Sequence, residues 1–179
     1  MAPDTSLVTH GIAALAYLTG TVLLVFRTRD APLAPALFAA FLATLIWSAT
    51  VCVGTVLSYP PVVAIQVTEL IRSMSWIFLL LAMLGIQEDG DSRVWLGIKW
   101  RPYFYITVAA SLTVILLRPL ETALAIDLGS SADLVLILWV LLSIAGLLAV
   151  EQLFRNASNN ERWAIKFLCL GLGAIFAYD

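Results

Sequence analysis

Long apolar stretches alternate with short polar or proline-containing connections along this 179-residue chain. A helix needs about 20 residues, at 1.5 Å per residue, to cross the roughly 30 Å hydrocarbon layer of a membrane. Most of the stretches have that length, and Pro60 and Pro61 separate two of them. The pattern therefore predicts six helices, over residues 7–26, 33–57, 62–86, 103–117, 134–154 and 163–179.

Composition assigns these helices to a membrane. Hydrophobic residues make up 61% of the chain and charged residues only 12%, and the mean hydropathy is +0.97. A soluble domain of this size cannot hide so much apolar surface, whereas lipid accepts it if each segment satisfies its own backbone hydrogen bonds. The predicted fold class is therefore all-α, a polytopic helical membrane bundle. The first run is too long for a signal peptide and no Lys or Arg precedes it, so we interpret it as a spanning helix.

Positive charge is sorted between alternate connections. Loops that retain Lys and Arg stay in the cytoplasm. The pattern therefore predicts cytoplasmic loops at 27–32, 87–102 and 155–162 and an N-terminus on the outer side. Eight of the ten Lys and Arg residues lie in or beside these loops: Arg27 and Arg29; Arg93, Lys99 and Arg101; Arg155, Arg162 and Lys166.

The sixth run is still apolar at Asp179, after a helical rise of only about 24 Å. We expect five complete transmembrane helices and a truncated sixth. We interpret residues 1–179 as the N-terminal membrane region of a longer protein. An outside N-terminus combined with five or seven spans would place a following domain in the cytoplasm.

The connection between the third and fourth runs mixes basic side chains with tryptophan. Trp95 and Trp100 are expected at the level of the lipid headgroups, with Lys99 and Arg101 reaching toward phosphates. The segment is therefore predicted to be an interfacial anchor, and a specific lipid site is the alternative.

One ionisable pair lies inside an apolar run. Glu69 and Arg72 are three residues apart on one face of the predicted third helix, roughly 10 and 15 Å along it from Val62. Ionisable groups at such depth are costly and usually face the interior of the bundle. Two interpretations stay open, an internal ion pair that fixes helix packing and a part of a ligand-sensing path. Trp76, one turn further on, would add a cation–π contact if its ring lay over the guanidinium.

Other candidate chemistry is sparse. The only histidine, His10, lacks clustered partner ligands, so we interpret it as an interfacial polar residue. The segment 88–91 has carboxylates at a spacing similar to that of metal ligands, but we interpret it as a solvated turn. No phosphate-binding glycine loop and no basic stripe for nucleic acid are present. We therefore predict no catalytic residue, metal, cofactor or nucleic-acid partner for this fragment.

Two further patterns are interpreted as structural. Glu151 and Arg155 are an acid–base pair four residues apart at the end of the fifth run, where a solvated, helix-stabilising pair is expected. Gly171 and Gly173 in the sixth run are expected to allow close helix packing.

Three stretches of the chain resemble a known family. Val150–Asn156, Glu161–Asp179 and Thr68–Trp76 are similar to parts of the membrane sensor region of the PEP-CTERM-system sensor histidine kinases. The resemblance covers essentially the whole chain and is strongest over Val150–Asp179. Its motifs are of the packing type and contain no catalytic atoms.

The resemblance implies a sensor, or input, module in the inner membrane of a bacterial two-component pathway, tied to exopolysaccharide production and exosortase-dependent protein sorting. It also implies a homodimer, a cytoplasmic response regulator as partner, and a kinase region outside this chain that uses ATP and Mg²⁺. The fragment itself is expected neither to bind ATP nor to autophosphorylate. A small polytopic transporter or a fragment of a membrane-embedded enzyme is the alternative, although transporters usually have inverted repeats and several midplane polar residues.

Overall fold

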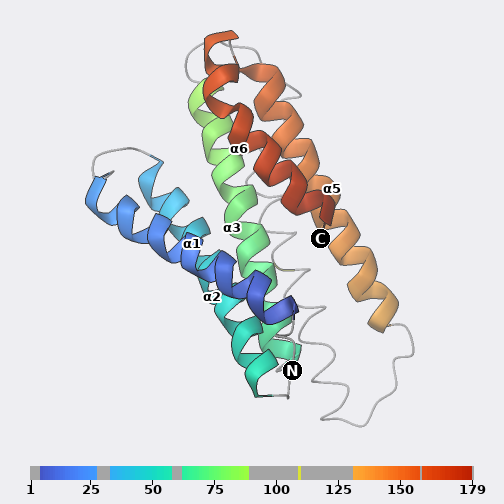
Figure 1. The fold of residues 1–179 in the computed structure, drawn as a ribbon. Helices are drawn as coiled ribbons and strands as arrows, with labels where there is room; N and C mark the ends of the chain where they lie inside the picture. Colours follow the sequence, from blue (N-terminus) through green and yellow to red (C-terminus); the bar gives the residue numbers. More distant parts are fainter. Residues whose placement is uncertain are drawn as a thin grey trace. The chain divides into compact units, whose positions relative to one another are not determined.

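The computed structural model describes residues 5–27, 33–57, 62–88, 109, 131–157 and 159–178. Within them the chain forms five helices and no strand (Figure 1): α1 (Thr5–Arg27), α2 (Ala34–Val56), α3 (Val62–Glu88), α5 (Ser131–Asn156) and α6 (Asn159–Tyr178). Each overlaps one predicted run, so the all-helical class is confirmed. Apart from Ala109, the predicted helix over 103–117 lies outside the described residues, as do the predicted anchors Trp95, Lys99, Trp100 and Arg101.

Four of the described helices are long and apolar enough to cross a membrane. The qualifying segments are Thr5–Phe26, Ala34–Val56, Val62–Leu84 and Leu136–Asn156, and α6 contains a shorter apolar segment, Ile165–Ala177. Large apolar side chains stay exposed on the outer faces of these helices, among them Leu15 and Phe26 on α1 and Val140 on α5. Such faces suit a lipid surrounding. Helices of this length and composition are those of a multi-pass membrane protein.

The chain divides into two compact units, Met1–Leu79 and Leu80–Asp179, and α3 continues across the boundary. In the first unit, α1 and α2 run in opposite directions and pack against each other (Figure 1). Small residues let helix backbones approach closely in lipid. On α2 they recur on one buried face at every fourth position: Ala36, Ala40, Thr44 and Ser48.

In the second unit, α5 and α6 form an antiparallel hairpin with a very short connection (Figure 1). Only positions 157 and 158 separate the helices, so the connection predicted over 155–162 is much shorter than expected. Arg162 of α6 bridges back to the end of α5: its Nε donates to the carbonyl oxygen of Ala157 at 3.0 Å and its Nη2 donates to that of Arg155 at 3.2 Å. Carbonyls at a helix C-terminus lack intrahelical partners, and a cation there also complements the helix dipole. Arg162, which the sequence pattern placed in a loop, therefore caps the C-terminus of α5.

Gly146 of α5 provides the close contact within this hairpin. The buried ring of Phe176 on α6 lies where a Cβ on Gly146 would stand, with Phe176 Cγ 2.6 Å from that position. Gly171 and Gly173, to which the sequence pattern assigned close packing, would have nothing within 4 Å of such a Cβ in the described part of the chain. Within the described residues, α6 therefore buries larger side chains and not its glycines. These are Cys169, Leu172 and Phe176.

Gly146→Ala should destabilise the hairpin even though alanine favours helix. Overpacking a core costs about 1–3 kcal/mol, whereas replacing glycine by alanine in a helix gains at most about 1 kcal/mol. We expect the free energy of unfolding in detergent, measured by circular dichroism, to fall by about 1 kcal/mol. Gly171→Ala is the matched control on α6 and should be neutral or slightly stabilising. Equal effects of the two substitutions would contradict the packing of Phe176 on Gly146.

Candidate functional site

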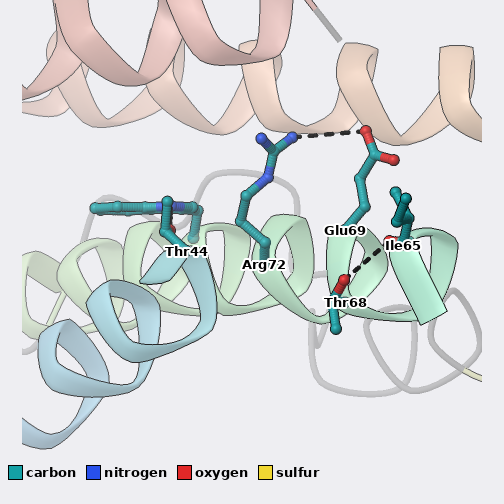
Figure 2. A network of polar contacts seen from close by, with 6 residues as sticks. Thr44, Ile65, Thr68, Glu69 and Arg72 are labelled. Atoms are coloured by element: carbon teal, nitrogen blue, oxygen red, sulfur yellow. Dashed lines mark hydrogen bonds and ion pairs between the residues drawn. The ribbon is translucent and has the colours of Figure 1, made fainter. Parts of the chain in front are cut away.

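Glu69 and Arg72 lie side by side on one face of α3, as their spacing predicted, while Thr68 points to the opposite side (Figure 2). Arg72 Nη2 is 3.9 Å from Glu69 Oε1, and the two side chains are 6% and 27% exposed, respectively. That distance is too long for a direct hydrogen bond, so the attraction is Coulombic. The cation is the buried member of the pair, and the carboxylate is the more exposed one.

The Arg72 guanidinium also contacts α2. Its Cζ lies 4.1 Å from the centroid of the Trp47 ring, which is a cation–π contact. The sequence pattern offered Trp76 for this stack, but the structure assigns it to Trp47. A desolvated contact of this kind contributes about 2 kcal/mol or more. Arg72 therefore connects α3 to α2 as well as to its neighbour on α3.

His10 brings α1 to the same place. Its ring meets the Trp47 ring edge-on, with centroids 5.2 Å apart and planes inclined by 61°. His10 Nδ1 lies 2.8 Å from the carbonyl oxygen of Ser6, and because a carbonyl only accepts, Nδ1 is the donor. In the neutral ring, Nε2 is then the acceptor nitrogen. The half-buried His10 thus takes part in a contact between α1 and α2.

Trp76 makes a second connection between the same three helices. Its Nε1 donates to Thr44 Oγ1 on α2 at 3.0 Å, and Thr44 Oγ1 donates in turn to the carbonyl oxygen of Ala40 at 2.8 Å. The buried Trp76 ring also packs against Phe41 of α2 and Tyr17 of α1, with centroids 5.9 and 6.5 Å away. Tyr17 and Phe41 contact each other edge-on at 5.3 Å. Trp76 is therefore held by a hydrogen bond and by two aromatic neighbours.

These residues form two neighbouring sets of contacts, one around Arg72 and one around Trp76. Along α3 the contacts advance from Arg72 to Trp76, while along α2 they go back from Trp47 to Thr44. This reversal is the register of antiparallel neighbouring helices. We call the two sets together the three-helix cluster, with eight members: His10, Tyr17, Phe41, Thr44, Trp47, Glu69, Arg72 and Trp76.

Three of the eight members were predicted from the sequence, namely Glu69, Arg72 and Trp76. The other five lie on α1 and α2. His10 was interpreted as an interfacial polar residue, and the remaining four were missed. Their only sequence signal is weak: Phe41, Thr44 and Trp47 are spaced by three residues, which places them near one face of a helix. Aromatic residues at such spacing are common in any apolar helix, so the pattern alone does not mark a site.

The three-helix cluster combines one cation, one carboxylate, an imidazole and several aromatic rings. In the described part of the chain, no group of three or more His, Cys, Asp or Glu side chains is placed to hold a metal ion. The acidic segment 88–91 lies outside the side chains that the structure describes. Trp47 Nε1 is buried and has no hydrogen-bond partner among the described residues. Such a group is suited to electrostatic and packing connections between helices.

Comparisons with protein families, with characterised proteins and with solved structures find no significant match to this chain. Functional inference therefore rests on the residues themselves, on the geometry of the three-helix cluster and on the resemblance described above.

Proposed function

We propose that this chain is the membrane input module of a bacterial two-component sensor histidine kinase, and that the three-helix cluster transmits the signal between α1, α2 and α3. The observation that carries the proposal is the buried Arg72 side chain, which contacts Trp47 on α2 and lies 3.9 Å from Glu69 on α3. A charge inside a membrane bundle is costly unless its partners accompany it. Movement of one helix therefore forces the others to rearrange, and the response is a discrete shift between packings.

Trp47 Nε1, which is buried and has no hydrogen-bond partner among the residues that the structure describes, supports a module with more than one packing arrangement. A buried donor without an acceptor costs about 1–3 kcal/mol. An alternative arrangement of α1, α2 and α3 that gave Trp47 Nε1 an acceptor would recover that free energy. A stimulus then needs only a modest difference in affinity between two arrangements to change their populations.

Topology and partners belong to the same proposal. The sorted Lys and Arg residues support a periplasmic N-terminus and five spans followed by a sixth in the inner membrane. The resemblance over Val150–Asp179 supports a kinase region outside these residues, which would use ATP and Mg²⁺ and pass phosphate to a cytoplasmic response regulator. It also supports a homodimer and a link to exopolysaccharide and PEP-CTERM genes.

The test is ATP-dependent autophosphorylation of the full-length protein in proteoliposomes. We expect incorporation of phosphate on histidine, and we expect Arg72→Gln to change its rate by roughly fivefold or more, the lower range of typical coupling between sites. The double substitution of Glu151 and Arg155 by glutamine is the control, because that pair is exposed and lies outside the three-helix cluster.

The possible failures are distinct. A full-length protein without ATP-dependent histidine phosphorylation would refute the kinase assignment. A kinase whose rate is the same in Arg72→Gln, in the control and in the unaltered protein would refute the role of the three-helix cluster while leaving the kinase assignment intact.

A further inference from the structure

The corner between α5 and α6 is an exposed basic and aromatic surface that the three-helix cluster does not include. Arg155 at the end of α5, and Arg162 and Lys166 at the start of α6, are all exposed. Trp163 follows Arg162 and Phe167 follows Lys166, and these two side chains are 72% and 73% exposed, respectively. Exposed aromatic rings are stable in an apolar environment, and cations need water or anions. A place where both kinds of side chain are exposed needs an environment that offers both.

Cations and aromatic rings are adjacent at this corner. Lys166 Nζ lies 5.3 Å from the centroid of the Trp163 ring, and Arg162 Cζ lies 5.7 Å from that of Phe154. Arg162 uses two of its five N–H donors to hold the carbonyls of Arg155 and Ala157, which fixes its position. The remaining donors of Arg162 and the ammonium group of Lys166 are the donors available to an external anion.

An apolar stripe on α6 indicates the depth of the corner in a membrane. Trp163, Phe167 and Leu170 follow one another at helical spacing and are all largely exposed. The adjoining segment of α5, Leu136–Asn156, is long and apolar enough to span a membrane. The corner is therefore at a membrane surface, where tryptophan lies at headgroup level and basic side chains meet lipid phosphates.

We propose that the α5–α6 corner binds the phosphate group of an anionic phospholipid. Arg162 and Lys166 are the cationic contacts, Trp163 is the ring at headgroup level, and the N-terminus of α6 adds partial positive charge at the same end. A lipid fits better than free phosphate, because the apolar stripe on α6 would lie along its acyl chains. The proposal holds on either side of the membrane and does not depend on a kinase function.

The charge balance sets the strength of the preference. Residues 151–166 hold three cations and two carboxylates, a net charge of +1. One carboxylate, Glu151, lies 3.5 Å from Arg155 Nε. The preference for an anionic lipid is therefore severalfold rather than absolute, and it rests mainly on Arg162 and Lys166.

Native mass spectrometry of the 179-residue chain in detergent tests the proposal. We expect phosphatidylglycerol to bind severalfold more tightly than phosphatidylcholine with the same acyl chains. Lys166→Gln should weaken phosphatidylglycerol binding roughly fivefold, because one basic residue at an anionic surface contributes about 1 kcal/mol. Lys166 is the informative position, since Arg162 also caps α5. Val140→Ala, at an exposed apolar position in the first half of α5 and away from the corner, is the matched control and should leave the lipid preference unchanged.

Three outcomes would overturn the proposal. The first is equal binding of the two lipids. The second is a preference for phosphatidylglycerol that survives both Lys166→Gln and Trp163→Ala in chains whose melting temperature is unaltered. The third is displacement of the lipid by millimolar inorganic phosphate, which would show a site for free anions.

Discussion

Neutralising Glu69 alone should destabilise the chain more than neutralising Glu69 and Arg72 together. Glu69→Gln leaves the buried Arg72 cation without its carboxylate. Breaking a fully buried pair costs about 3–5 kcal/mol. We expect about 2 kcal/mol here, because Glu69 is 27% exposed and Trp47 continues to face the guanidinium. Adding Arg72→Gln removes the buried charge and should restore part of the loss.

A double-mutant cycle on the free energy of unfolding in detergent measures this interaction. The exposed Glu151–Arg155 pair is the matched control, with side chains 53% and 67% exposed and a 3.5 Å separation. Its coupling should not exceed about 0.5 kcal/mol, although its atoms are closer than those of Glu69 and Arg72. Coupling of equal size in the two pairs would show that burial contributes nothing and that Glu69 and Arg72 face a wet surface.

The cycle also separates the two interpretations of the pair. If Glu69 and Arg72 only fix helix packing, the doubly substituted form of the proposed sensor kinase should keep its response once folded. If they belong to the sensing path, that protein should fold but remain in one signalling state. Stability and the autophosphorylation of the proposed kinase are therefore measured on the same variants.

The extent of the helices could be predicted from the sequence because the constraint is local. A spanning segment must satisfy its own backbone, so its apolar length determines where it begins and ends. The predicted run 62–86 and α3 (Val62–Glu88) agree for this reason. The connection between α5 and α6 was predicted less well, since the capping of α5 by Arg162 depends on three-dimensional contacts that composition does not encode.

The partners of Arg72 could not be predicted for a related reason. The depth and the one-sided spacing of Glu69 and Arg72 follow from the sequence of α3 alone. Which ring lies over the guanidinium depends on the register of α2 against α3, and the sequence of α3 alone does not encode that register. Trp76 was the candidate because it lies one turn from Arg72 on the same helix, whereas the contact with Trp47 of α2 arises from packing between helices. Packing between helices also decides that the ring of Phe176 lies against Gly146, which the sequence of α6 alone does not show.

Trp76→Ala should be the most destabilising single truncation in the three-helix cluster. It removes a buried ring that packs against Tyr17 and Phe41. It also removes the indole N–H that donates a hydrogen bond to Thr44 Oγ1. Truncating a buried tryptophan costs about 3–5 kcal/mol, because the surrounding side chains refill the space only in part. Trp163→Ala is the matched control on an exposed ring and should change stability by no more than about 0.5 kcal/mol.

Two smaller substitutions divide the loss at Trp76 into its parts. Trp76→Phe keeps an aromatic ring and removes the donor, and interhelical hydrogen bonds in membranes contribute about 0.6–2 kcal/mol. Thr44→Val keeps the volume but leaves the buried indole N–H without its acceptor, so it should cost about 1–3 kcal/mol. Combining Thr44→Val with Trp76→Phe should then lower the free energy of unfolding by less than the sum of the two single losses. In the double variant neither the indole N–H nor the threonine hydroxyl is left without its partner. Strictly additive losses would mean that Trp76 and Thr44 do not share a hydrogen bond, and that α2 and α3 are connected at this level by ring packing alone.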